Sequence, residues 1–401
     1  MTSPRDPKNE DVSRDALDPY DTGRETSERV QLISDLPPPP PVPSPVAQSH
    51  SAAAEILTPE AEVFLRSFRK RYPVEGVVER LRGLRKLKVL VIGDTIIDEY
   101  HFVRPYGMPT KAPVIAAQFQ NAEAYAGGVL AVANHVAGYC DEVHLVSALG
   151  GDDSKEDFVR ANLRPNITAK LFVEPGRPTT VKRRYLRKFL LQKLFEVSFY
   201  DDKPLRPELD REVCAYLGDI IGQYDLVIAS DFGHGMITRA MVALLSMRAR
   251  YLAVNTQLNS INFGYHVATR YPRADYVCID EEEARMACRD RECHVEELLH
   301  SLSRDLAPKV ITVTRGHHGS VTWKSDETFA HVPVLSRQVV DTVGAGDAFL
   351  SVAAPCACAG FSPELVGFIG NAVGALAVRI VGNAQPVHPE MLFEFLRSIL
   401  K

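Results

Sequence analysis

Apolar residues come in short blocks along most of this chain. From Lys88 onward these blocks alternate with longer stretches of helical pattern, and they include KVLVIGD, DLVIASD, YLAVNT, ADYVCID and KVITVTRG. Unbroken apolar runs of about four to eight residues are typical of parallel strands that are buried on both faces. Strands that alternate with helices of this length predict an α/β domain, in which helices cover both faces of a mainly parallel sheet.

Two segments do not follow this rhythm, one near 99–120 and the other near 178–200. Both are rich in β-branched, aromatic and charged residues, as in TTVKRRYLRKF. This composition favours strands, and its high charge places them outside the main sheet. We expect the two segments to form a small β-sheet lid over one edge of the domain.

The N-terminal part of the chain has a different composition. Residues 1–57 are rich in Pro, Ser, Asp and Glu, and they contain DLPPPPPVPSP. We expect a disordered tail with a stiff polyproline stretch, and the alternative is a docking segment for a partner. Thr58 can cap a helix whose first residue is Pro59, so 58–87 predicts a helical extension. The α/β domain is then expected to occupy 88–401.

Composition and charge narrow the class of protein. The net charge of −5 gives no general reason to expect binding to nucleic acid or to an acidic membrane surface. No apolar run reaches about 18 residues, so we expect no membrane span. The seven cysteines show no paired CxxC spacing. Free thiols in a reducing cytoplasm are therefore expected, and the polar, acidic N-terminus does not fit a secretory signal.

The stretch VVDTVGAGDAFLS contains the clearest candidate chemistry. Gly344 and Gly346 allow the backbone to approach a ligand, and the helix that follows begins with unpaired N–H groups that attract anions. Asp347 would lie beside an anion held there, where it could accept the proton of an attacking hydroxyl. The alternative is an acid that only stabilises the start of the helix.

The same stretch carries a resemblance. DTVGAGDAF is similar to the D-T-x-G-A-G-D signature of the ribokinase-type (PfkB) carbohydrate kinases, and the chain resembles that family from about Lys88 to its C-terminus. Within the family it is most similar to the kinase domain of bacterial heptose-phosphate kinases. The matching segments, in the same order, include GDTIIDEY, AGGVLAVANHVA, SALGGDD, ASDFGHG and VTRGHHG. The resemblance implies a ribokinase-like three-layer α/β/α sandwich with a small β-sheet lid, and a kinase that uses ATP and Mg²⁺.

The resemblance also implies roles for individual residues. Asp347 would be the general base, and the amides of Gly344, Ala345 and Gly346 would form an anion hole. The residues expected near ATP are Thr314, Arg315, Gly316, Asn371, Gly382 and Asn383. Asp280 and Glu283 would organise Mg²⁺ through water molecules, although DEEEAR taken alone favours a solvated acidic helix start.

On the acceptor side the resemblance points to acids that follow the first strand. Asp94 and Asp98 would accept hydrogen bonds from sugar hydroxyls, and Gly127 and Gly128 would let the backbone approach the sugar. The alternative for Asp94 is a turn residue at a strand end. Asp231, which ends LVIASD, is a further candidate because open α/β sheets bind ligands at the carboxyl ends of their strands.

Three positions depart from the pattern of the heptose kinases. Ala131 stands where these kinases have the Asn of G-G-x-x-N, Lys111 stands in place of a lid Glu, and Asp280 replaces an Asn. Loss of the Asn amide removes two donors and an acceptor from the sugar site. These differences indicate either another acceptor or weakened catalysis.

The second lid segment carries five cations in seven residues. Alternation along a strand turns some of them inward. There they would suit an acceptor that already carries phosphate, and we expect Lys182 and Arg184, together with Lys111, to contact it. The alternative is a charged edge strand that resists aggregation. His234, His317 and His318 lack metal-site spacing and are expected to be ordinary polar residues.

We therefore predict an ATP-dependent sugar kinase that acts on a sugar phosphate of the heptose 7-phosphate type at its anomeric oxygen. The alternatives are a kinase for another sugar or a nucleoside, and a non-catalytic member that binds nucleotide or sugar phosphate. Lids in this family often pair between subunits, so we expect a homodimer through the lid. Heptose kinases are often fused to a nucleotidyltransferase with an HxGH motif, which is not found in this sequence, so a separate protein is expected for that step.

Overall fold

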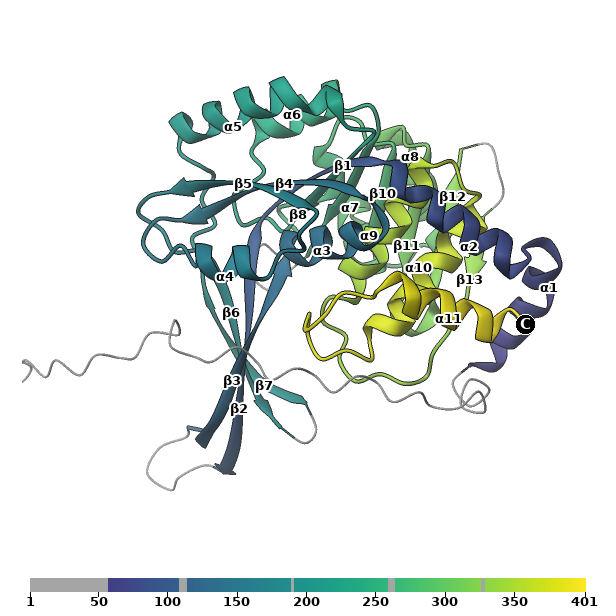
Figure 1. The fold of residues 1–401 in the computed structure, drawn as a ribbon, viewed down its shortest axis with the longest axis horizontal. Coiled ribbons are helices and arrows are strands. Elements are labelled where there is room, and N and C mark those ends of the chain that lie inside the picture. The colour runs from purple at the N-terminus through teal and green to yellow at the C-terminus, as the bar shows by residue number, and fades with distance from the viewer. Residues whose placement is uncertain (1–56, 108–113, 189–190, 259–263, 326–328) are drawn as a thin grey trace, which may run out of the picture. The chain divides into compact units, whose positions relative to one another are not determined.

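The computed structural model describes residues 57–107, 114–188, 191–258, 264–325 and 329–401 (Figure 1). The tail predicted for 1–57 lies almost wholly outside these residues, and so does Lys111. Two helices, α1 (Pro59–Arg71) and α2 (Val74–Gly83), precede the first strand. Thr58 caps α1, since its side chain accepts a hydrogen bond from Ala61 N at 3.1 Å. None of the described helices is both long enough and apolar enough to cross a bilayer.

A nine-stranded sheet forms the centre of the molecule. Its first seven strands in spatial order from one edge are mutually parallel, and the last two, β12 and β13, are antiparallel to their neighbours. The order is β5 (Ile167–Glu174), β4 (Glu142–Gly150), β1 (Lys88–Gly93), β8 (Leu226–Asp231), β9 (Leu252–Thr256), β10 (Tyr276–Asp280), β11 (Val310–Thr314), β12 (Ser320–Lys324) and β13 (Ala330–Val332).

Helices cover both faces of this sheet. Strand β1 shows why, because Val89 and Val91 belong to one hydrophobic core while Leu90 and Ile92 belong to the other. The first core includes α3 (Val129–Tyr139), α9 (Ala345–Cys358), α10 (Pro363–Ala377) and α11 (Pro389–Ile399), with α1 and α2 outside them. The second includes α5 (Pro207–Ile220), α6 (Arg239–Arg248), α7 (Glu281–Cys288) and α8 (Val295–Leu306). A short helix, α4 (Glu156–Ala161), and 3-10 turns at Leu84–Lys86, Ile221–Gln223, Ala268–Arg270 and Gly316–His318 complete the described elements.

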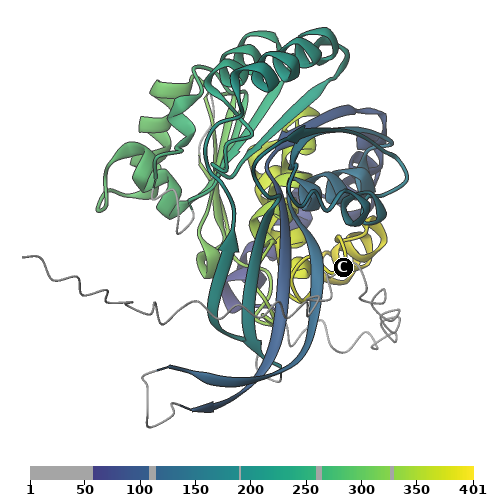
Figure 2. The ribbon, with the colours of Figure 1, turned by 90° about the vertical axis from the view of Figure 1, so that its left-hand side faces the viewer.

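The segments that interrupt the α/β rhythm form a separate four-stranded sheet. Its order is β3 (Ala116–Gly128), β2 (Thr95–Gly107), β6 (Thr180–Arg187) and β7 (Gln192–Phe199), with β2 and β6 parallel and the outer pairs antiparallel. This sheet projects away from the helical layers in both views (Figures 1 and 2). The predicted α/β/α sandwich with a mainly parallel sheet and a small β-sheet lid is confirmed.

Candidate active site

The glycine turn before α9 has a geometry that only glycine adopts readily. Gly344 has a φ of 80°, in the left-handed region, and a Cβ atom there would lie 2.1 Å from Asn383 Oδ1. Helix α9 begins at the next residue, so Asp347 lies in its first turn. The amide of Ala345 donates to Thr342 O at 3.3 Å, so this one amide of the predicted anion hole is occupied within the turn.

Asp347 is buried, and its carboxylate is held by a residue from another element. Gln257 Nε2, in the segment after β9, donates to Asp347 Oδ1 at 2.6 Å. Burial raises the pKa of Asp347 to about 7, with a smaller contribution from the negative charge of Asp98, while Gln257 and Lys182 oppose the shift. A carboxylate with a pKa near neutrality is suited to accepting a proton at physiological pH.

A pocket of about 230 Å³ opens beside Asp347. It lies at the carboxyl ends of β9, β10 and β11, which is where open α/β sheets bind ligands. The residues around it include Asn255, Gln257, Asp280, Glu283, Thr314, Thr342, Gly344, Gly346 and Asp347. The structure thus brings four predicted features together around one pocket. They are the general base, the glycine turn, Thr314 and the two acids predicted to organise Mg²⁺.

Asp280 and Glu283 form a capping box at the start of α7. Asp280 Oδ1 accepts from Glu283 N at 2.7 Å, and Glu283 Oε2 accepts from Asp280 N at 2.8 Å. Leu258 N also donates to Glu283 Oε1, at 2.8 Å. Burial, and then the nearby Asp280, raise the pKa of Glu283 to about 8, and burial also raises the pKa of Asp280. Glu283 is therefore a buried acid, whereas Asp280 at the end of β10 is exposed.

The structure supplies no direct metal cage near these acids. Among the described residues, no three His, Cys, Asp or Glu side chains are grouped so that they could hold a metal ion. Two carboxylates at the rim of the pocket nevertheless fit Mg²⁺, which prefers oxygen ligands and keeps several of its water molecules. The water-mediated role of Asp280 and Glu283 stays a prediction.

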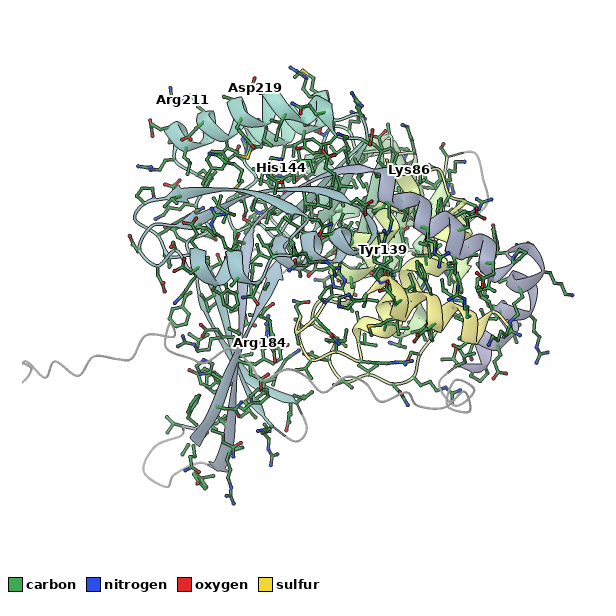
Figure 3. All side chains as sticks on the ribbon, viewed as in Figure 1. Lys86, Tyr139, His144, Arg184, Arg211 and Asp219 are labelled. Carbon is green, nitrogen blue, oxygen red and sulfur yellow. The ribbon has the colours of Figure 1, made fainter. Side chains whose placement is uncertain are left out.

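Asp98 lies where the lid meets the body. Its Oδ1 accepts a hydrogen bond from Arg184 of β6, and its Oδ2 accepts from Asn383 Nδ2 at 3.3 Å. Arg184 also pairs with Glu196 of β7 at 2.9 Å, and Figure 3 shows Arg184 on the lid strands. A Cβ atom at Gly127 would lie 2.2 Å from Asp98 Oδ2, so glycine is needed there for the carboxylate to fit.

Asp94 is held by the loop that follows β8. Its Oδ2 accepts from the amides of Phe232 at 3.0 Å and His234 at 3.4 Å, and its Oδ1 accepts from the amide of Met236 at 2.9 Å. A carboxylate that binds three amides orders this loop, so Asp94 has a structural function. Contact with a sugar stays a prediction, since a carboxylate offers about four lone-pair sites.

Asp231 is also held from several sides. Its carboxylate accepts from Arg270 Nη1 at 2.8 Å, from the Tyr271 hydroxyl at 3.0 Å and from Gly233 N at 3.2 Å. Burial raises its pKa to about 6, against the opposing effect of Arg270. These contacts give Asp231 a structural role in the turn after β8.

Several residues predicted to contact ATP have other partners. Gly382 N donates to Asp341 Oδ2 at 2.9 Å, and Asn383 lies against Asp98 and Gly344. Both residues therefore lie close to the lid side of the site, and their place beside the adenine stays a prediction. Asn371 is buried in α10, where its Nδ2 donates to Ser320 Oγ of β12 at 2.6 Å.

The segment after β11 is closer to the prediction. Thr314 is part of the pocket wall, and Gly316 begins the 3-10 turn that follows. Arg315 Nε donates to Glu281 Oε2 at 2.8 Å, which ties this turn to the first turn of α7. Arg315 and Gly316 therefore lie close to the acids of the pocket, while their contact with ATP stays a prediction.

With this geometry in place, comparisons with known proteins identify the family. The family model described as pfkB family carbohydrate kinase matches residues 86–390. This chain belongs to that family. The kinase is 28% identical over 323 residues to the bifunctional protein HldE of Shewanella amazonensis, and 24% identical over 326 residues to that of Pelobacter propionicus. These matches cover 79% and 80% of the chain but only 65% of each relative.

Solved structures agree on the fold. The ribokinase of Thermotoga maritima superposes with a TM-score of 0.60 at 19% identity, over 78% of this kinase and 99% of that chain. Phosphofructokinase-2 of Escherichia coli, in complex with substrates and products, gives a TM-score of 0.61 at 14% identity, over 78% and 100%. At such identities the likeness shows the fold alone.

The sequence interpretation assigned no role to two residues of the kinase site. Asp341, the first residue of DTVGAGD, accepts from the Tyr100 hydroxyl at 2.6 Å and from Lys193 Nζ at 3.0 Å, both in the lid. Burial tends to raise its pKa, but these donors and the amides of Gly382 and Val343 lower it overall. The motif itself signalled Asp341, whereas nothing local to Gln257 indicated its contact with Asp347.

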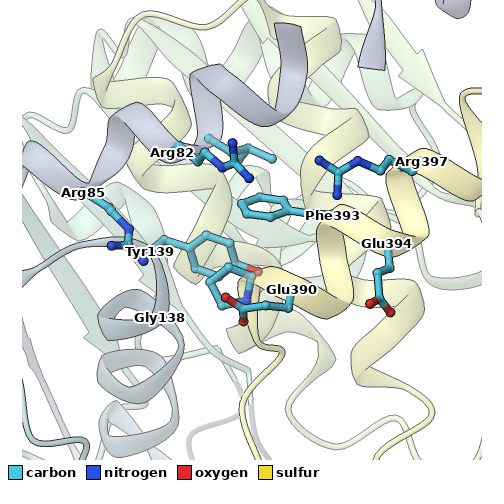
Figure 4. A pocket seen from close by; sticks show the side chains of 10 residues that line it. Arg82, Arg85, Gly138, Tyr139, Glu390, Phe393, Glu394 and Arg397 are labelled. Atoms are coloured by element: carbon cyan, nitrogen blue, oxygen red, sulfur yellow. The ribbon is translucent and has the colours of Figure 1, made fainter. Parts of the chain in front are cut away.

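A larger cavity, of about 510 Å³, lies elsewhere in the kinase. It is lined from α2, α11 and the C-terminal end of α3, so it lies at the opposite end of α3 from Gly128 (Figure 4). Arg82 lies over the Phe393 ring at 5.6 Å, and Arg397 binds Glu75. This cavity is separate from the pocket at Asp347.

Proposed function

We propose that this carbohydrate kinase transfers the γ-phosphoryl group of ATP, with Mg²⁺, to a phosphorylated sugar of the heptose 7-phosphate type at its anomeric oxygen. One observation carries the proposal. Asp347 is buried at the start of α9 with a pKa of about 7, beside a pocket and near Asp98. Relatives named HldE support the heptose acceptor, and the departures at Ala131 and Lys111 leave another sugar or a nucleoside as the second candidate.

Asp347 would act as the general base. It accepts the proton of the attacking hydroxyl, which becomes a better nucleophile toward the γ-phosphorus. Amides of the glycine turn and the positive end of the α9 dipole would stabilise the negative charge on the transferred group. Asp280 and Glu283 would hold Mg²⁺ through water, and the ion would supply further positive charge at the phosphates.

The lid would supply the cations for a phosphorylated acceptor. Lys182 is half-buried, and burial lowers its pKa, while the negative charges of Asp98, Glu196 and Asp94 oppose that shift. Arg184 is already paired with Asp98 and Glu196. A phosphate would therefore have to share Arg184 with these acids, so Lys182 is the cation better placed to bind it.

The test of this function is acceptor-dependent release of ADP. The kinase, with ATP and Mg²⁺, is incubated with a panel of sugar phosphates, free sugars and nucleosides. We expect turnover with a heptose 7-phosphate, and a loss of about a thousandfold or more in Asp347→Asn because the base is removed. Unchanged turnover in Asp347→Asn would refute the mechanism. Binding of an ATP analogue with silence across the panel would favour a non-catalytic member.

We also propose that the kinase forms a homodimer through its lid. The outer face of the lid carries an aromatic row across all four strands, formed by Phe119, His101, Tyr185 and Phe195. Phe119 is 58% exposed and Phe195 is 46% exposed, so both ends of this row present apolar area to solvent. Exposed apolar patches of this kind mark association sites.

Sedimentation tests the homodimer. Phe119→Ser with Phe195→Ser should shift the kinase from dimer to monomer, because the change removes apolar area from the face that would be buried. The matched control is Met247→Ser, which alters a residue of α6 that is 74% exposed and lies away from the lid. A wild-type kinase that sediments as a monomer at all concentrations would refute the dimer.

A further inference from the structure

His234 is a buried histidine without hydrogen-bond partners on its ring. It lies in the loop after β8, and only 3% of the residue is exposed. Within the part of the chain that the structure describes, neither Nδ1 nor Nε2 has a hydrogen-bond partner. Buried polar groups are nearly always paired, and leaving one unpaired is costly. Two unpaired nitrogens on one ring therefore require an explanation.

The surrounding cavity limits what could bind the ring. His234 lines a space of about 10 Å³, together with residues that include Asp94, Thr95, Gly150 and Arg177. This volume holds about one water-sized group. A phosphate group is too large, whereas a single hydroxyl group fits.

The charge state of the ring matches a hydroxyl as well. Burial lowers the pKa of His234, so the imidazole is neutral near pH 7, and the charged or titratable groups that face it are Asp94, Lys182, Asp202 and His266. A neutral imidazole has one donor and one acceptor nitrogen, and a hydroxyl both accepts and donates. A metal ion is not indicated, because no three potential ligands gather among the described residues.

Asp94, which is predicted to contact the acceptor, fixes the position of the ring through the loop backbone. The amide of His234 and its neighbours are bound by Asp94, the acid that follows β1. The Tyr200 ring packs against the imidazole, with centroids 5.8 Å apart. Asp94 uses three of its roughly four lone-pair sites on amides. One site is left for the ligand that would bind the His234 ring.

We propose that His234 hydrogen-bonds one hydroxyl group of the acceptor sugar and so determines which sugars the kinase accepts. This inference rests on the proposed function, since it assumes that a sugar binds between Asp94 and the lid. His234 would be a specificity residue that contacts the acceptor, and Asp94 would hold it in place through the loop amides.

Binding is tested first without turnover. The full chain is labelled with ¹⁵N-histidine, and its imidazole resonances are followed by NMR while D-mannose, D-fructose, D-ribose, fructose 6-phosphate and a heptose 7-phosphate are added. We expect at least one of these to shift the His234 resonances, with no change at His300, which lies on α8 beside Trp323. If none of them moves His234, the inference is wrong, whatever the ADP assay shows.

A second measurement distinguishes a bound sugar hydroxyl from a structural water. For the sugar that shifts His234, the Kd is measured for the sugar and for its single-deoxy analogues, in the wild type and in His234→Phe, which keeps a ring but has no donor or acceptor. One deoxy analogue should bind about tenfold more weakly to the wild type, because one hydrogen bond is lost, but about equally to the variant. Equal losses in both proteins, for every analogue, would leave only a water at His234 and overturn the proposal. His300→Phe, the matched control, should behave as the wild type.

These experiments separate the two proposals. Shifts at His234 without ADP release would support the hydroxyl site and refute the kinase mechanism at Asp347. ADP release without a shift of the His234 resonances would support the kinase mechanism and refute the hydroxyl site. Should His234→Phe lose its fold, as judged by its Tm, His234→Leu provides the second variant, and it should likewise bind the sugar and that deoxy analogue about equally.

Discussion

At the scale of single residues, the central feature is a pair of carboxylates with opposite environments. Asp347 and Asp341 lie six positions apart on either side of the same glycine turn. Burial raises the pKa of Asp347 to about 7, whereas four donors keep the pKa of Asp341 below its usual value. One acid can therefore exchange a proton near neutrality, and the other stays charged and holds structure.

This difference predicts the pH dependence of catalysis. Asp347 must be deprotonated to act as a base, so kcat/KM should fall about tenfold for each pH unit below about 7 and be level above it. The measurement is a pH profile of ADP release, with the Tm recorded at each pH to exclude unfolding. A profile that stays level down to pH 5 would assign the base to another group.

The raised pKa of Asp347 also affects stability. The resulting pH dependence of stability is opposite in sign to that of an acid in a salt bridge. A carboxyl whose pKa is higher in the folded state than in the unfolded state favours folding at low pH, and this contribution is lost as the pH rises toward 7. Asp347→Asn removes the buried charge. The Tm of the variant should therefore exceed that of the wild type at pH 8 and by less at pH 5, as thermal unfolding would measure.

At the scale of elements, the sequence predicted the helices, strands and turns that depend on the pattern of neighbouring residues. Alternating apolar runs predicted the parallel strands, and the glycine spacing before Asp347 predicted the turn into α9. Contacts between distant segments were not predictable in this way. Asp94 binds amides about 140 positions away, and Asn383 reaches Asp98 across 285 positions, so nothing near either residue indicates its partner. Nothing near Gly382 or Asn383 in the sequence indicated that they bind Asp341 and Asp98, and their predicted place beside the adenine stays a prediction.

Helix α7 permits a test of the predicted magnesium site. Glu283→Gln keeps one hydrogen-bond acceptor for the capping box but removes the carboxyl group that would face the water shell of Mg²⁺. We expect the Mg²⁺ concentration for half-maximal ADP release to rise about tenfold to a hundredfold. Glu282→Gln is the matched control, because Glu282 is exposed on the same turn and should leave this concentration unchanged. An equal response in both variants would place the ion elsewhere.

At the scale of the whole molecule, one carboxylate joins the lid to the body. Asp341 accepts from Tyr100 of β2 and from Lys193 of β7, and it also accepts from the amides of Gly382 and Val343. The Val343 contact holds the turn before α9, where the general base lies. The position of the lid and the geometry of the glycine turn therefore depend on the same group.

Removal of one hydroxyl should show this dependence. Tyr100→Phe deletes the donor to Asp341 and should lower the free energy of unfolding by about 1.5–3 kcal/mol, because the lost hydrogen bond involves a charged acceptor. A lid that is held less firmly excludes water less well, so acceptor-independent ATP hydrolysis should rise and the amides of β2 and β6 should exchange faster. Tyr125→Phe is the matched control, since the Tyr125 hydroxyl donates to Glu123 within the lid itself. If hydrogen exchange and ATP hydrolysis respond equally in the two variants, the effect comes from the lid sheet, and Asp341 is not what couples the lid to the site.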